Sequence, residues 1–306
     1  MPPRSVQVSG HRLCYQDAGP ADGPVVVLVH GLVSDSSTWA PATSALAERG
    51  VRVIAPDLLG HGASDKPVCS VGQYSLSGFA DCVRDLLNAL GVPRATLVGH
   101  SLGGAIAMHI AYHYPAQVER LVLVASGGLG KGVHPVLRAA AVPGAPLLLR
   151  SLLNRPTMGL ARWLRVHRVL RLPPRVVANL QRAFGGLAIP AGRAAFFAAL
   201  RSVISPSGQR GSMIEMRYVG DHVPTLIVWS EHDHVIPVSH ARALHAYLPS
   251  SQLALFPGTT HQPHYRYADG FATLVADFVA TTAPAGSSLE FPQSGAVAQP
   301  VRAGDS

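Results

Sequence analysis

One short stretch, Gly99-His100-Ser101-Leu102-Gly103, restricts the possible folds of this chain more than any other feature. It follows the apolar run ATLVG and precedes a helix-like segment, so it forms a Gly-x-Ser-x-Gly turn between a strand and a helix. Bulky side chains two residues either side of such a turn would collide with the strand and the helix, which explains both glycines. Ser101 is therefore expected at the carboxyl edge of a sheet, in front of a helix N-terminus that favours negative charge.

Two other interpretations of this stretch fit less well. A glycine-rich helix start with a capping serine does not require the strand that precedes it. The residues also lack the Gly-Lys-Ser/Thr ending of a P-loop and the Gly-x-Gly-x-x-Gly spacing of a dinucleotide site.

Short β-branched runs bounded by Gly, Pro or Asp have the pattern of buried parallel strands. They cover residues 25–30, 51–56, 95–99, 120–125 and 224–229. Helix-like stretches at 38–49, 76–90 and 102–114 separate the first of them. Because strand and helix alternate, we predict an α/β fold with a doubly wound, mostly parallel sheet.

The alternation stops between Ser126 and His222, where Leu-, Ala- and Arg-rich segments are broken by repeated prolines. We expect a helical cap without strands at residues 127–221, inserted into a core formed by 1–126 and 222–282. Residues 283–306 are small and polar and lack periodicity, which predicts a flexible C-terminal tail.

Composition excludes several classes of protein. With 306 residues, 48% of them hydrophobic and 14% charged, the chain can bury a large core. Its apolar runs are too short for a membrane-spanning helix. Three scattered cysteines and an N-terminus without an apolar signal region predict a cytoplasmic protein without a disulfide framework.

A nucleophilic serine needs a base and a group that orients the base. Asp233 follows the predicted strand at 224–229, and His261 follows a further predicted strand at 252–256, with a helix expected at 238–248 between them. Both side chains should emerge at the same sheet edge as Ser101. Two alternatives remain beside them: Glu231 for the acid, although it lacks the four-residue spacing to proline, and His264 for the base.

These motifs together resemble the α/β-hydrolase superfamily, in particular the capped serine hydrolases of the esterase and lipase type. The resemblance rests on His30-Gly31, residues 57–64 (DLLGHGAS), residues 99–104, Asp233-x-x-x-Pro237 and His261. It implies that Ser101 is the nucleophile, His261 the general base and then acid, and Asp233 the orienting carboxylate. It also implies an oxyanion hole formed by the backbone N–H groups of Leu32 and Leu102, with neither an organic cofactor nor a metal.

A metal site is an alternative use of the same loops. His232-Asp233-His234 and His261-x-x-His264 supply metal-ligand side chains, and a zinc ion would compete for Asp233 and His261. The serine motif explains these two positions without a metal. His30 resembles a structural histidine of the superfamily, and we assign it no chemistry.

Positive charge is concentrated in the predicted cap. The segment from Gly127 to Arg217 contains thirteen Arg and Lys131 but a single acidic residue, Glu215. Arg162, Arg165, Arg168 and Arg171 recur every three residues beside an apolar stripe, a pattern that suits peripheral contact with anionic membrane and equally a solvated helix face. Aromatic residues for base stacking are sparse, so nucleic acid is not expected as a partner.

The resulting functional prediction is a serine hydrolase that cleaves a carboxylic ester or related acyl bond of a small hydrophobic substrate. A carbon–carbon bond hydrolase of ring-cleavage products is the first alternative, although members of that group often carry Asn where this chain has His100. Acyl transfer to an alcohol and a non-catalytic ligand receptor on the same fold are the others.

Overall fold

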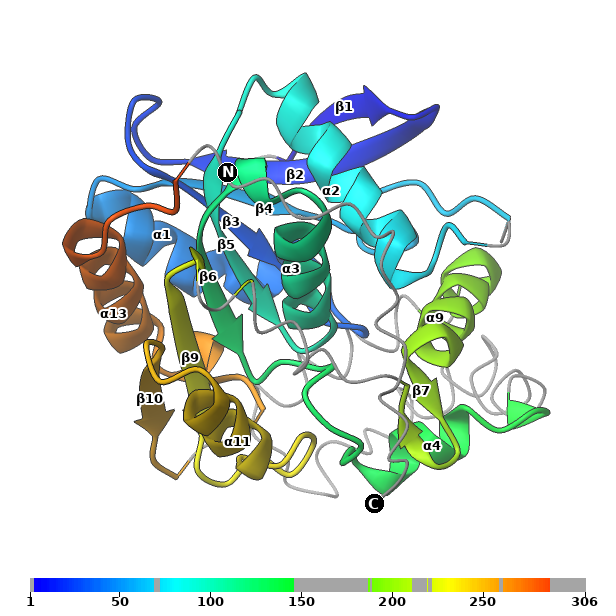
Figure 1. The fold of residues 1–306 in the computed structure, drawn as a ribbon. Helices are drawn as coiled ribbons and strands as arrows, with labels where there is room; N and C mark the ends of the chain where they lie inside the picture. Colours follow the sequence, from blue (N-terminus) through cyan, green and yellow to red (C-terminus); the bar gives the residue numbers. More distant parts are fainter. Residues whose placement is uncertain are drawn as a thin grey trace, which may run out of the picture.

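An eight-stranded sheet forms the centre of the computed structural model, which describes residues 3–68, 72–145, 187, 189–210, 219, 222–258 and 261–286 (Figure 1). The strand order is β1-β2-β4-β3-β5-β6-β9-β10. The strands are β1 (Arg4–Val8), β2 (His11–Ala18), β3 (Val25–Val29), β4 (Arg52–Pro56), β5 (Ala95–His100), β6 (Val118–Val124), β9 (Thr225–Ser230) and β10 (Gln252–Phe256). Strand β2 is antiparallel to β1 and β4, and the other neighbours are parallel, which confirms the mostly parallel sheet.

Helices cover both faces of the sheet, as a doubly wound fold requires (Figure 1). On one face, α2 (Leu76–Ala89), α3 (Leu102–His113) and α11 (Ser239–Tyr247) contribute to a single large hydrophobic cluster. On the other face, α1 (Ala40–Glu48) and α13 (Ala268–Thr281) form a second cluster. Three short helical turns connect these layers: η1 (Ser36–Trp39), η2 (Pro115–Gln117) and α12 (Pro263–Arg266).

Local sequence explains why α2 begins and packs where it does. Ser75 caps the helix by accepting the backbone N–H of Gly78 at 3.1 Å. Phe79, Val83 and Leu86 recur at helical spacing and are buried on one side. The helix therefore lies with its apolar side on the sheet, as its sequence pattern predicts.

The N-terminal hairpin formed by β1 and β2 was absent from the sequence prediction. Its turn contains Ser9 and Gly10, both with positive φ (48° and 80°). Most side chains of β1 are exposed, so the sequence of this edge strand needs no continuous apolar run. The pattern used to predict the buried strands is therefore missing here. The helix α13 was also not predicted from the sequence.

The described part of the cap includes α4 (Pro135–Ala140), α9 (Pro190–Val203) and a two-stranded hairpin, β7 (Ile204–Ser205) with β8 (Gly208–Gln209). The expectation of a cap without strands is therefore wrong at this hairpin. Gly208 explains the turn: its φ is 130°, and a Cβ there would lie 2.3 Å from the carbonyl oxygen of Lys131. The arginine-rich stretch from Arg162 to Arg171 lies outside the described residues.

The first residues of the predicted tail are attached to the core. Ala285 is buried, its N–H donates to the carbonyl of Glu119 at 2.9 Å, and its own carbonyl accepts from the Arg94 guanidinium. The chain is thus fixed to the sheet as far as Ala285, while residues 287–306 lie outside the described part. Within the residues that the structure describes, no helix is long and apolar enough to cross a membrane.

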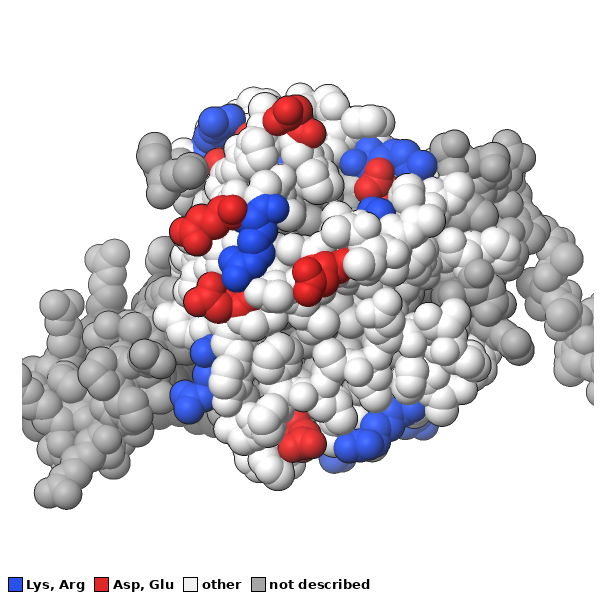
Figure 2. All heavy atoms as spheres, turned by 90° about the vertical axis from the view of Figure 1, so that its left-hand side faces the viewer, with Lys and Arg blue, Asp and Glu red and all other residues white. Residues whose placement is uncertain are grey.

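Charge on the face shown in Figure 2 is mixed in sign, with Lys and Arg side chains scattered among Asp and Glu. Arg49 of α1 lies 3.7 Å from Asp269 of α13, and both side chains reach solvent. An exposed pair of this kind contributes little to stability. Among the residues that the structure describes, positive charge on this face is thus interspersed with negative charge.

Candidate active site

Ser101 occupies a strained turn between β5 and α3. Its φ and ψ are 54° and −116°, a combination that a residue with a side chain rarely adopts. Backbone hydrogen bonds hold it there: its N–H donates to Val124 at 3.0 Å, and its carbonyl accepts from Gly127 at 2.9 Å, Gly104 at 3.0 Å and Ala105 at 3.4 Å. The surrounding backbone therefore fixes the strained conformation and presents the side chain above the sheet edge.

The two flanking glycines are sterically necessary, as the sequence predicts. A Cβ on Gly99 would lie 2.2 Å from the carbonyl oxygen of Gly103. A Cβ on Gly103 would lie 2.1 Å from the carbonyl oxygen of Val29, at the end of β3. The helix thus starts against the neighbouring strand with no space for a side chain.

Asp233 and His261 are brought together across 28 positions of sequence. Nδ1 of His261 lies 2.8 Å from Oδ2 of Asp233, whose side chain is fully buried. The other carboxylate oxygen accepts the N–H groups of Val235 at 2.7 Å and Ile236 at 3.0 Å. The carboxylate is thus fixed by backbone donors, and it orients the imidazole so that Nε2 is the nitrogen left for another partner.

The alternatives for these two positions are not brought into the site. Glu231 is exposed, and its backbone N–H pairs with β10. His264 is fully buried with its ring centroid 4.1 Å from that of Trp39, and its Nε2 lies 3.5 Å from Oγ1 of Thr38. Burial and the neighbouring His261 lower the pKa of His264 to about 3, so the ring is neutral at pH 7.

Apart from Asp233 and His261, which contact each other, the residues of the metal alternative do not converge. His232 and His234 are exposed, while His264 packs among aromatic rings. Among the described residues, no three His, Cys, Asp or Glu side chains are grouped so that they could hold a metal ion.

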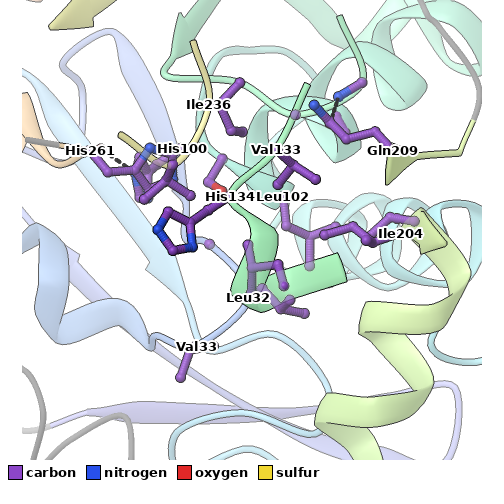
Figure 3. Close-up of a pocket in the computed structure, with 18 of the residues that line it drawn as sticks. Leu32, Val33, His100, Leu102, Val133, His134, Ile204, Gln209, Ile236 and His261 are labelled. Carbon is purple, nitrogen blue, oxygen red and sulfur yellow. Dashed lines mark hydrogen bonds between the residues drawn. The ribbon is translucent and has the colours of Figure 1, made fainter. Parts of the chain in front are cut away.

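A cavity of about 690 Å³ opens above Ser101. Most of its lining is apolar, contributed by the core and by the cap: Leu32, Leu76, Leu102, Ala105, Val133, Leu137, Val203, Ile204 and Ile236. In Figure 3, His100 and His261 lie on one side of the cavity and Ile204 on the opposite side. Ser101 and His261 both line this space, which is of the size that small-molecule sites occupy.

Leu102 provides one backbone donor at the base of the cavity. It is the first residue of α3, where helix N–H groups have no partner within the helix. The aligned peptide dipoles of α3 add positive potential at this end. Its N–H therefore lies where a negatively charged oxygen beside Ser101 would be stabilised.

Leu32 is the second expected donor, and His30 holds the peptide group to which its N–H belongs. Nε2 of the buried His30 accepts the N–H of Leu58 at 3.0 Å, which leaves the ring proton on Nδ1. Nδ1 therefore donates to the carbonyl of Gly31 at 2.8 Å. Because C=O and N–H point in opposite directions in a trans peptide, the N–H of Leu32 points away from His30.

Two residues near the site had no assigned role at the sequence level. Nε2 of the buried His100 lies 2.8 Å from the carbonyl oxygen of His261 and thus supports the loop that carries the imidazole. Gln209 of the cap hairpin accepts the N–H of Gly128 at 2.7 Å and donates to the carbonyl of Gly132 at 2.8 Å. The position of His100 beside Ser101 was a usable sequence signal, whereas nothing in the sequence around Gln209 indicates its contacts.

Comparisons with known proteins identify the fold family of the chain. Residues 24–266 match the family model described as alpha/beta hydrolase fold. An uncharacterized protein of Mycobacterium tuberculosis is 40% identical over 283 residues, which cover 91% of this chain and 81% of that protein. The 2-hydroxy-6-oxo-6-phenylhexa-2,4-dienoate hydrolase of Burkholderia cepacia is 28% identical over 89% of this chain and 93% of its own. The crystal structure of a hydrolase from Pseudomonas aeruginosa PA01 superposes with a TM-score of 0.69 at 25% identity, covering 91% and 98% of the two chains.

Proposed function

Because the chain belongs to the alpha/beta hydrolase fold family, we propose that it is a serine hydrolase that cleaves a carboxylic ester or a related acyl bond. In this proposal Ser101 is the nucleophile, His261 the general base and acid, and Asp233 the orienting carboxylate. The observation that carries it is the 2.8 Å contact between His261 Nδ1 and Asp233 Oδ2, in a cavity that Ser101 also lines.

The first half of the reaction forms an acyl-enzyme. Oγ of Ser101 attacks the substrate carbonyl carbon while its proton passes to Nε2 of His261. Asp233 stabilises the imidazolium that results. The carbonyl oxygen becomes an oxyanion, held by the N–H groups of Leu32 and Leu102. Collapse of the intermediate breaks the bond to the alcohol, which leaves with the proton from His261.

The second half regenerates Ser101. A water molecule gives its proton to His261 as its oxygen attacks the acyl carbon. When this second intermediate collapses, the carboxylic acid is released and Oγ of Ser101 takes the proton back. The same two N–H groups support both oxyanions, so one arrangement serves both halves.

The apolar cavity supports a hydrophobic acyl or alkyl group in the substrate. Leu102 and Ala105 come from α3, while Val203 and Ile204 come from the cap, so such a group would lie between core and cap. Burying each methylene there contributes about 0.8 kcal/mol.

A carbon–carbon bond hydrolase is the second candidate, and the similarity to the Burkholderia cepacia enzyme favours it. Both activities would use Ser101, His261 and Asp233, so the residues do not separate them. Parallel assays of nitrophenyl esters and of 2-hydroxy-6-oxo-6-phenylhexa-2,4-dienoate would distinguish the two activities. The substrate with the larger kcat/KM identifies the bond that the enzyme cleaves.

The experiment that tests the proposal is covalent labelling with a fluorophosphonate, located by mass spectrometry, beside hydrolysis of nitrophenyl esters from acetate to palmitate. We expect labelling at Ser101 and an optimum in chain length. Labelling elsewhere would overturn the assignment of the nucleophile. Labelling at Ser101 without turnover of any ester or of the dienoate would favour a receptor or an acyltransferase. Contact of the arginine-rich cap with anionic membrane stays a prediction.

A further inference from the structure

His61 lies in a turn in which both neighbouring positions require glycine. Gly60 and Gly62 have positive φ values of 84° and 49°. A Cβ on Gly60 would lie 2.5 Å from the Tyr74 ring, and one on Gly62 would lie 2.2 Å from a carboxylate oxygen of Asp57. This turn therefore presents the imidazole of His61 in one fixed direction, which neither the family motif nor the proposed chemistry explains.

Both ring nitrogens of His61 lie beside carbonyl oxygens. Nε2 is 2.8 Å from the carbonyl oxygen of Leu32, and Nδ1 is 3.0 Å from that of Leu59. Burial lowers the pKa of His61 to about 4, helped by the neighbouring His30, so the ring carries a single proton at pH 7. The contact with Leu32 is the shorter of the two, and we assign that proton to Nε2, from which it is donated to Leu32.

We propose that His61 is a positioning residue for the oxyanion hole, which acts by holding the carbonyl of Leu32. The inference rests on the proposed acyl chemistry and deepens it. His30 fixes the peptide that precedes the Leu32 Cα, through the carbonyl of Gly31, and His61 fixes the peptide that follows it. With both peptide planes held, the N–H of Leu32 has one direction before substrate binds.

Leu32 needs such support because it lies in a loop outside any helix or strand. The chain leaves β3 at Val29 and enters η1 only at Ser36. The next residue, Val33, is 37% exposed, so packing on the solvent side is slight. The backbone hydrogen bonds of a sheet or helix do not fix this segment. Hydrogen bonds from the side chains of His30 and His61 fix it instead.

The turn that carries His61 is itself fastened by two charged groups. The carboxylate of Asp57 accepts the N–H groups of Ser36 at 2.8 Å and Ala63 at 2.7 Å. The ammonium of Lys66 donates to the carbonyls of Gly62 at 2.7 Å and Ser64 at 2.9 Å. His61 is therefore a rigid donor, which is what preorganisation of an oxyanion site requires.

Two variants test the proposal. His61→Phe keeps a ring of similar size but removes the donor, and His61→Gln retains an amide N–H that can reach the carbonyl of Leu32. For His61→Phe we expect kcat to fall on the order of 10-fold or more, with KM unchanged, because the hole acts mainly in the transition state. His61→Gln should recover most of the loss. Affinity for a boronic acid, which forms a tetrahedral anion on Ser101, should weaken by the same factor as kcat.

Phe79→Leu is the matched control. Phe79 packs its ring 6.1 Å from that of His61 but makes no hydrogen bond to Leu32, so this variant should lower Tm and leave kcat unchanged. If His61→Phe retains the kcat and boronic acid affinity of the wild type, or if Phe79→Leu loses both equally, the proposal is overturned. Labelling and ester turnover of the wild type are measured first, so their absence would refute the proposed function and not the role of His61.

Discussion

Asp233 holds His261 with one carboxylate oxygen while its other oxygen is anchored by backbone. Oδ2 lies 2.8 Å from Nδ1 of the imidazole, and Oδ1 accepts the N–H groups of Val235 and Ile236. The carboxylate therefore cannot rotate without losing backbone hydrogen bonds. Because one oxygen is held by backbone and the other faces Nδ1, the carboxylate fixes the imidazole tautomer. The effect of a substitution at Asp233 can therefore be predicted.

Asp233→Asn should preserve the fold and nearly abolish turnover. The Asn carbonyl can still accept from Val235 and Ile236, which leaves its NH₂ group facing Nδ1 of His261. Nδ1 must then be unprotonated, and Nε2 carries the proton and cannot accept one from Ser101. We expect kcat to fall about 10⁴-fold with Tm little changed. Glu231→Gln, at an exposed site, is the control and should retain the wild-type kcat.

Ser101→Ala and His261→Ala should each reduce kcat by ~10⁴-fold or more, because nucleophile and base act as a unit. The double variant should lose little beyond either single one. Steady-state ester hydrolysis measures all three. A single variant with turnover near the wild-type value would refute the assignment of that residue.

Gly99→Ala and Gly103→Ala should destabilise the protein at the serine turn. The new methyl groups would lie 2.2 Å and 2.1 Å from backbone oxygens that cannot easily move. We expect a loss of about 1–3 kcal/mol in the free energy of unfolding, or failure to fold. Gly270→Ala provides the contrast: it lies in α13, where the nearest atom to a new Cβ is 3.7 Å away, so it should gain about 0.5–1 kcal/mol. Urea unfolding measures each change.

The parts of the fold that follow from short-range pattern could be predicted from the sequence. The buried runs of β3, β5, β6 and β9 are continuous, and the serine turn with its glycines is a local steric requirement. Strand ends predicted that Asp233 and His261 emerge at the sheet edge of Ser101, whereas the roles of the three residues came from the family resemblance. The hairpin of β1 and β2 could not be predicted, because an exposed edge strand needs no apolar pattern.

The supporting contacts of the site could not be predicted, because they join residues far apart in sequence through single hydrogen bonds. His61 and Leu32 are 29 positions apart, and His100 and His261 are 161 apart. Gln209 reaches the loop after β6 from the cap. Hydrophobic periodicity carries no information on such pairs, which depend on the assembled sheet.

Ala105→Leu should shift the preference of the enzyme toward short acyl groups. Ala105 lies one turn along α3 from Leu102 and lines the cavity, so three added carbons would occupy space that we assign to the substrate. We expect kcat/KM for long-chain esters to fall on the order of 10-fold or more, while the acetate ester is hydrolysed as before. An equal loss with both esters would mean that the acyl chain does not lie along α3.

The buried histidines should make the protein lose stability in mild acid. His264 lies between Trp39 and His100, with ring centroids 4.1 Å and 4.5 Å away, and burial lowers its pKa to about 3. In the unfolded chain its pKa is about 6.5, so below that pH the unfolded state binds more protons than the folded one. The contribution of this group to the free energy of unfolding is therefore fully present above pH 6.5. As the pH falls toward 3, the free energy of unfolding declines by about 1.4 kcal/mol per pH unit for each such group. His61, with a pKa of about 4, acts in the same direction.

His264→Phe removes one of these titrating groups and places an aromatic ring beside Trp39 and Phe271. The decline of Tm between pH 6.5 and 5, measured by circular dichroism, should become shallower than in the wild type. His232→Gln, at an exposed position, should leave the wild-type slope unchanged. If His264→Phe and the wild type decline in parallel, protonation of His264 does not contribute to acid unfolding.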